Sequence, residues 1–224
     1  MAISKRTGEL GKGKSTGTEN TSIKSSNMKR KSSTGKKDGN TEKTGIKAGE
    51  SAKIKTDTSE FLETTDSKGN VTGLAGRSEL HGDPSLIHRV VHVLLFNNKG
   101  DLLLQKRSQN KDVAPGKWDT SVGGHVNPGE DISDAAKREM QEELGISGCS
   151  LKFLYKYLFS NHIESELVST FSCIYDGEIY FNKEEIDEVK FLDLKSIKEN
   201  LGTGIFSNHF EKEIENFLKK NQNI

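Results

Sequence analysis

Apolar residues from position 61 onward follow two spacings, and these predict an alternation of strands and helices. Residues 61–66 and 71–77 flank a Ser-Lys-Gly-Asn turn and predict a hairpin. The continuous apolar run at 90–96 predicts a central strand. Further extended segments are expected at 102–107, 118–126, 151–159, 167–175 and 189–192.

Helical spacing predicts a helix over 131–144, with acidic residues in its first turn and Gly145 just beyond its end. Its apolar stripe consists of Ala135, Ala136, Met140 and Leu144. Two more helices are expected near the end of the chain, at 194–200 and after an N-cap at Ser207. This order of elements predicts an α/β fold, a mixed sheet covered by helices on both faces in an α/β/α sandwich.

The first 57 residues have a different composition, rich in Lys, Ser, Thr, Gly and Asn, and the first aromatic residue is Phe61. Such a segment cannot build a core, so we expect a low-complexity, disordered leader at 1–57 and a folded domain at 58–224. The leader carries 14 basic and 6 acidic residues, a net of +8, and because the whole chain is balanced the remainder carries −8. The leader therefore favours anionic partners, although it has no aromatic residues for stacking on bases.

Residues 8–15 match the letters of a phosphate-binding P-loop, Gly-x4-Gly-Lys-Ser. That loop functions between a buried strand and a helix, whose N-terminus faces the phosphate. Neither element is expected here, so we interpret the match as an accident of composition. No apolar run predicts a signal peptide or a membrane span, and two cysteines without metal-ligand spacing fit reduced thiols. A cytoplasmic protein is expected.

The helix at 131–144 places three carboxylates on one face, because Glu139, Glu142 and Glu143 stand at positions i, i+3 and i+4. Like charges at this spacing repel unless a cation lies between them. Hard oxygen ligands of this kind suit Mg²⁺ or Mn²⁺, which usually keep positions open for water and phosphate. The alternative is a solvated helix with a charged face.

Residues 124–146 read Gly-x5-Glu-x7-Arg-Glu-aliphatic-x-Glu-Glu-x-Gly-aliphatic, which resembles the Nudix box at every defined position. The resemblance implies the Nudix fold and a hydrolase that cleaves an organic diphosphate with the help of divalent metal. It further implies that Glu139, Glu142 and Glu143 bind metal. Arg138 would orient these carboxylates from behind.

A second group of potential ligands lies outside the box and consists of His81, His88, His125, Glu164 and Glu166. Glu164 and Glu166 alternate on one strand, so both can face the same side. Three imidazoles and two carboxylates suit Mn²⁺ or Mg²⁺ and, less well, Zn²⁺. Each residue alone is more often an ordinary polar side chain.

The chain from about residue 60 to 197 also resembles the isopentenyl-diphosphate isomerase branch of the Nudix superfamily. The similarity lies in the segments 88–96, 102–107, 115–118, 121–125 and 164–166. It implies that the five histidines and glutamates hold a metal and that Arg107 and Lys111 contact the diphosphate. Trp118 either stacks on a base or fills the core. At the position of the isomerases' acid/base cysteine, this chain has Gly123, which disfavours isomerisation. The intact box in turn favours hydrolysis.

The sequence thus predicts a metal-dependent diphosphohydrolase in which a bound water attacks phosphorus. Its general base would be one of three carboxylates, Glu142, Glu143 or Glu166. The alternatives are an isopentenyl-diphosphate isomerase and a non-catalytic protein that binds a small-molecule diphosphate. The sequence specifies neither the group attached to the diphosphate nor the oligomeric state.

Overall fold

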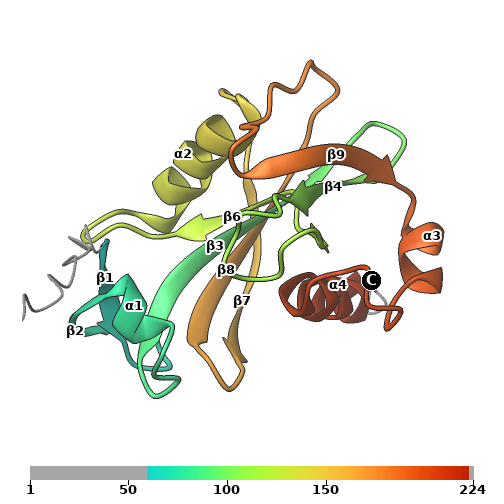
Figure 1. The fold of residues 1–224 in the computed structure, drawn as a ribbon. Helices are drawn as coiled ribbons and strands as arrows, with labels where there is room; N and C mark the ends of the chain where they lie inside the picture. Colours follow the sequence, from blue (N-terminus) through green and yellow to red (C-terminus); the bar gives the residue numbers. More distant parts are fainter. Residues whose placement is uncertain (1–59, 222–224) are drawn as a thin grey trace, which may run out of the picture. The chain divides into compact units, whose positions relative to one another are not determined.

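A computed structural model describes residues 60–221 of the chain (Figure 1). The expected basic leader and its P-loop letters lie outside these residues. None of the described helices is long and apolar enough to cross a membrane.

Nine strands form one sheet in the described part of the chain. They are β1 Phe61–Thr65, β2 Val71–Gly76, β3 Ile87–Phe96, β4 Leu102–Arg107, β5 Trp118–Asp119, β6 Val122–His125, β7 Lys152–Ser160, β8 Ser165–Ile174 and β9 Ile186–Leu192. The helices of this region are α1 Arg77–Leu80, α2 Ile132–Leu144, α3 Leu194–Glu199 and α4 Asn208–Asn221.

The sheet is mixed, as the sequence predicts. Its longest ladder joins β3 to β8 in parallel, over ten residue pairs from Ile87↔Ser165 to Phe96↔Ile174. The other strand pairs are antiparallel, including β7 with β8 and β6 with β3. The predicted central strand is confirmed and begins three residues earlier than its apolar run.

Alternate residues of β3 build two apolar layers, because successive side chains point to opposite faces of a strand. Val91, Val93 and Leu95 pack with the apolar stripe of α2. Leu94 packs instead with Phe210 and other residues of α3 and α4. Helices therefore cover both faces, α2 on one and α3 with α4 on the other (Figure 1), which confirms the α/β/α sandwich.

Two local features differ from the sequence prediction. The extended segment 118–126 is interrupted between β5 and β6, where the buried Ser121 hydroxyl donates to the Leu103 carbonyl at 2.6 Å and accepts from the Leu95 amide at 2.9 Å. The expected second hairpin strand ends at Gly76, and the chain turns into the one-turn helix α1. The break between β5 and β6 depends on a long-range contact and helix α1 on a turn, and the spacing of apolar residues indicates neither.

The sheet forks beside β3. β3 and β4 share a single register pair, Phe96↔Leu102. From there β3 pairs with β6, whereas β4 pairs with β5 and β9. The fork separates two arms of the sheet, and the space between them contains the candidate site.

Candidate active site

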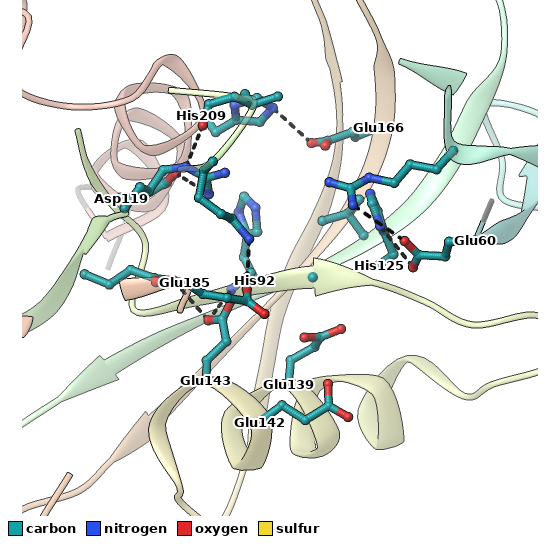
Figure 2. A pocket seen from close by; sticks show the side chains of 18 of the residues that line it. Glu60, His92, Asp119, His125, Glu139, Glu142, Glu143, Glu166, Glu185 and His209 are labelled. Atoms are coloured by element: carbon teal, nitrogen blue, oxygen red, sulfur yellow. Dashed lines mark hydrogen bonds and ion pairs between the residues drawn. The ribbon is translucent and has the colours of Figure 1, made fainter. Parts of the chain in front are cut away.

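A cavity of about 300 Å³ opens at the fork. Glutamates from α2 lie along one side of it, and Glu166 with His209 lies on the opposite side (Figure 2). The cavity brings together all the site residues predicted from the sequence except two. His88 is fully buried behind the wall, and Trp118 does not line the cavity.

Local capping fixes the helix that carries the first carboxylates. The Asp131 side chain accepts a hydrogen bond from the Ser133 amide at 2.7 Å, and Gly145 ends the helix with φ 67°. Both are preferred capping arrangements, which is why the sequence located α2 to within one residue.

The three glutamates of α2 lie in different surroundings. Glu142 is exposed, with 57% of its side chain accessible, whereas Glu143 is buried. Glu139 lies against Gly124 of β6, so closely that a β-carbon at Gly124 would overlap its carboxylate. The glycine at this position leaves the space that the carboxylate occupies.

Arg138 joins the helix to the loop in front of it. Its guanidinium donates to both carboxylate oxygens of Glu130, at 2.9 and 3.0 Å, and to the His125 carbonyl at 2.9 Å. It also donates to Glu139 at 2.6 Å and to Glu142 at 3.1 Å. Hydrogen bonds to Arg138 lower the pKa of Glu130. The planar fork of one arginine thus fixes the carboxylates beside the cavity.

Glu143 bridges the two arms of the sheet. It accepts from the side-chain amide of Gln105 on β4 at 3.0 Å and from the Gly123 amide on β6 at 3.3 Å. Burial first, and the nearby charges of Glu139 and Glu185 next, raise its pKa to about 8. Burial likewise raises the pKa of Glu139.

The five histidines and glutamates of the second group also converge. His81, His88 and His125 present ring nitrogens within 4.8 Å of one another, and the same limit holds for His88, Glu164 and Glu166. Burial lowers the pKa of His88 to about 4, which leaves its imidazole neutral and able to coordinate.

Both ring nitrogens of His88 are buried and have no hydrogen-bond partner among the described residues. Buried polar atoms are usually satisfied. Neutral imidazoles mixed with carboxylates form a ligand set that suits Mn²⁺ or Mg²⁺. The residues present therefore fit a divalent cation.

His209, near the start of α4, was missed by the sequence analysis. Its Nε2 lies 3.4 Å from an oxygen of Glu164 and 3.4 Å from an oxygen of Glu166. Burial alone would lower its pKa, but the two carboxylates raise it to about 10, and His209 in turn holds the pKa of Glu166 near 2. Its only sequence signal is a histidine in the first turn of the last helix.

Arg107 and Lys111 line the cavity, as the sequence analysis expected of substrate-binding residues. Arg107 donates to the Val113 carbonyl at 2.8 Å and lies 3.4 Å from Asp119. Lys111 is paired with Glu185 at 2.8 Å. Neither acid was identified from the sequence: Asp119 directly follows Trp118 but carries no signal of its own, and Glu185 belongs to a segment distant from the motifs.

Trp118 packs in the apolar layer formed with α3 and α4, the core position that the sequence analysis kept as an alternative to stacking. Among the described residues, the cavity lining contains no aromatic side chain other than histidine, and its aliphatic members are Val90 and Val113. The lining is otherwise polar or charged, apart from two glycines.

Known proteins are similar to this chain in sequence and in fold. An uncharacterised Nudix hydrolase of Pseudomonas aeruginosa is 35% identical over 133 residues, which cover 59% of this chain and 78% of that protein. An isopentenyl-diphosphate Delta-isomerase of Photorhabdus laumondii is 35% identical over 144 residues, covering 62% and 80%.

Among solved structures, a protein of Deinococcus radiodurans shares the fold at a TM-score of 0.62, with 24% identity over 70% of this chain and 98% of that one. A MutT protein of Methanosarcina mazei matches at a TM-score of 0.53, with 28% identity, covering 62% and 96%. The family model described as the NUDIX domain matches residues 86–210. These residues contain the carboxylate helix, most of the second ligand group and the fork, and the chain belongs to the NUDIX family.

Proposed function

We propose that this protein is a metal-dependent hydrolase that cleaves an organic diphosphate, of the nucleoside-diphosphate type or another, by attack of water at phosphorus. One observation carries the proposal: the carboxylates of α2 and the cations Arg107 and Lys111 face a single cavity. A diphosphate needs cationic groups for its oxygens and a base for the attacking water, and the cavity offers both.

The residues proposed to hold Mg²⁺ or Mn²⁺ are Glu139, Glu142 and Glu143 of α2, together with His81, His88, His125, Glu164 and Glu166. When bound, the cation would neutralise phosphate charge and acidify a coordinated water. Arg138 supports this arrangement because it donates to both Glu139 and Glu142.

The protein's own groups suffice to orient the substrate and to move a proton. Arg107 and Lys111 bind the phosphate remote from the reaction. Of the three candidate bases, Glu143 is favoured, because its buried carboxylate lies where the two arms of the sheet meet and is held there by hydrogen bonds from both. Its two hydrogen-bond donors, Gln105 and the Gly123 amide, fix the carboxylate in one orientation.

The lining of the cavity favours a compact, polar substrate. A nucleobase would find no phenyl, phenol or indole ring to stack on among the residues that line it, and an isoprenyl chain would contact only two valines. We therefore place small polar groups attached to a diphosphate ahead of bulky bases and lipids.

Isopentenyl-diphosphate isomerisation is the second candidate, favoured by the 35% identity to a protein named as that isomerase. The arrangement at β6 disfavours it: Gly123 stands where the resemblance places an acid/base cysteine, and glycine has no proton to give. Both candidate reactions use the same cavity and differ in product.

Purified full-length protein with Mg²⁺ or Mn²⁺, incubated with ADP, NAD, ADP-ribose, the compact polar 5-phosphoribosyl diphosphate and isopentenyl diphosphate, separates the candidates. Released phosphate or nucleotide supports hydrolysis, and dimethylallyl diphosphate supports isomerisation. No reaction with any of them would refute hydrolysis of these diphosphates. Glu143→Gln should lower kcat by at least about 10²-fold. The matched control is Glu199→Gln, an exposed glutamate of α3 outside the cavity, which should keep wild-type kcat.

A further inference from the structure

A buried carboxylate behind the cavity has no part in the proposed reaction so far. Glu213 of α4 is fully buried, and four side chains donate to it. Tyr155 donates to one oxygen at 2.6 Å, while His92 Nδ1, at 2.8 Å, Tyr157 and Thr170 converge on the other. Four donors from three strands mark a preorganised site rather than a chance contact.

The state of Glu213 fixes the orientation of the His92 ring. Burial alone would raise the pKa of this carboxyl, but hydrogen bonds from His92, Tyr155 and Tyr157 lower it. An ionised carboxylate can only accept hydrogen bonds, so Nδ1 of His92 carries its hydrogen. The other nitrogen, Nε2, is then left to act on something else.

Nε2 of His92 lies on the cavity side of the ring. His92 is the register partner of Gly123, and a β-carbon at Gly123 would stand 3.2 Å from Cδ2 and 3.5 Å from Nε2 of the ring. Because residue 123 is glycine, no side chain at this position covers that edge of the buried imidazole. His92 and Gly123 both line the cavity, and Figure 2 shows His92 there.

A carboxylate that accepts a hydrogen bond from one nitrogen of an imidazole holds the ring in one tautomer, with the other nitrogen free to face a reaction site. The same carboxylate stabilises the imidazolium that forms when the free nitrogen takes up a proton. An anionic diphosphate in the cavity adds to that stabilisation. The cavity thus contains the proposed base, Glu143, and an imidazole, His92, that is held in one orientation with its free nitrogen toward the cavity.

We propose that His92 is a catalytic acid of this protein, donating from Nε2 to the diphosphate, and that Glu213 is the residue that positions it. The inference rests on the proposed hydrolysis. The water oxygen bonds to phosphorus and loses a proton to Glu143. The bond from phosphorus to the bridging oxygen breaks, its electron pair stays on the leaving phosphate, and that oxygen takes the proton from His92. Proton exchange with solvent restores both residues.

The test uses the full-length protein with Mg²⁺ and whichever of ADP, NAD, ADP-ribose and 5-phosphoribosyl diphosphate the wild type hydrolyses fastest. In His92→Asn the amide N–H stands where Nδ1 stood, so the bond to Glu213 is kept and nothing reaches the cavity at Nε2. We expect kcat to fall by about 10²-fold or more with KM changed little. His162→Asn, the same exchange at an exposed histidine outside the cavity, is the matched control.

Two further measurements separate chemistry from folding. Added imidazole should restore activity to His92→Ala, since the small ring can occupy the space beside Glu213. Glu213→Gln should lower kcat rather than raise KM, and the double variant with His92→Asn should lose no more than His92→Asn alone, because the two residues act as a unit.

Each contrary result has a definite meaning. If His92→Asn keeps kcat within about twofold while Glu143→Gln is inactive, the hydrolase stands and the role of His92 is overturned. Loss of activity in His92→Ala without rescue by imidazole, accompanied by a lower melting temperature, also overturns it. A wild-type chain inert toward all four substrates overturns the proposed hydrolysis and this inference together.

Discussion

Gly124 shows how one residue without a side chain sets the geometry of the site. Its α-carbon faces the carboxylate of Glu139, where a β-carbon would overlap. We expect Gly124→Ala to displace Glu139, to destabilise the fold by about 1–3 kcal/mol through overpacking, and to weaken Mn²⁺ binding. Thermal unfolding and calorimetric titration with Mn²⁺ measure the two effects.

The neighbouring glycine provides the control. A β-carbon at Gly123 would approach the His92 ring at 3.2 Å, a tight contact without the overlap found at Gly124. Gly123→Ala should therefore lower the melting temperature less and keep Mn²⁺ affinity close to that of the wild type. Equal losses in the two variants would contradict the role assigned to Gly124.

Among single residues, the sequence could predict the site residues that share a local pattern. Arg138 and the three glutamates of α2 lie within six positions of one another, so helical periodicity places them on one side. Gln105, Glu185 and His209 reach the cavity from three separate segments, and only the folded sheet brings them there. No local sequence pattern marks these three residues as members of the site, because only the tertiary fold brings them together.

Among the elements, α4 is tied to the sheet by Glu213, which accepts hydrogen bonds from β3, β7 and β8. The folded-state pKa of this carboxyl lies below the ordinary value of 4.5. As the pH falls, the unfolded chain therefore binds a proton before the folded one does. The stabilisation is fully present above pH 4.5 and is lost as the pH falls through the folded-state pKa.

Glu213→Gln removes this titration, so the variant should be less stable at neutral pH and lose less additional stability between neutral and acidic pH than the wild type does. Urea unfolding at a series of pH values measures both. Parallel curves for the two proteins would show that Glu213 is not charged in the folded state.

The N-cap of α2 allows a second test among the elements. Asp131→Ala leaves the Ser133 amide without its acceptor and should cost about 1 kcal/mol. Asp134→Ala, three residues further on, removes only an exposed pair with Lys137 and should cost less. Urea unfolding distinguishes the two, and a larger loss in Asp134→Ala would contradict the capping argument.

Helix ends were predictable because a cap is local: Asp131 and Gly145 lie next to the residues they serve. The break between β5 and β6 was not, because its cause is the bond from Ser121 to a carbonyl 18 positions earlier. The short helix α1 was not predicted either, because a single turn contains too few residues for a helical spacing of apolar positions to be recognised.

For the molecule as a whole, the cavity gathers several carboxylates whose mutual repulsion a cation would relieve. A cation held by these residues would bind the folded chain in preference to the unfolded one, so it should raise stability by about 2.7 kcal/mol at 100 times its Kd. Melting temperatures should rise with Mn²⁺ and fall back when a chelator is added. The double variant Glu139→Gln/Glu143→Gln should show a smaller rise, and an unchanged response would place the cation elsewhere.

The fork of the sheet places residues proposed to bind the substrate and residues proposed to bind metal on different elements. Lys111 and Val113 stand on the connection from β4 to β5, which belongs to one arm, whereas Gly124 and the helix that follows belong to the other. A change in the length or sequence of that connection should alter which substrates are accepted and leave the carboxylates of α2 in place. One scaffold can in this way accept different substrates while it keeps the same catalytic groups.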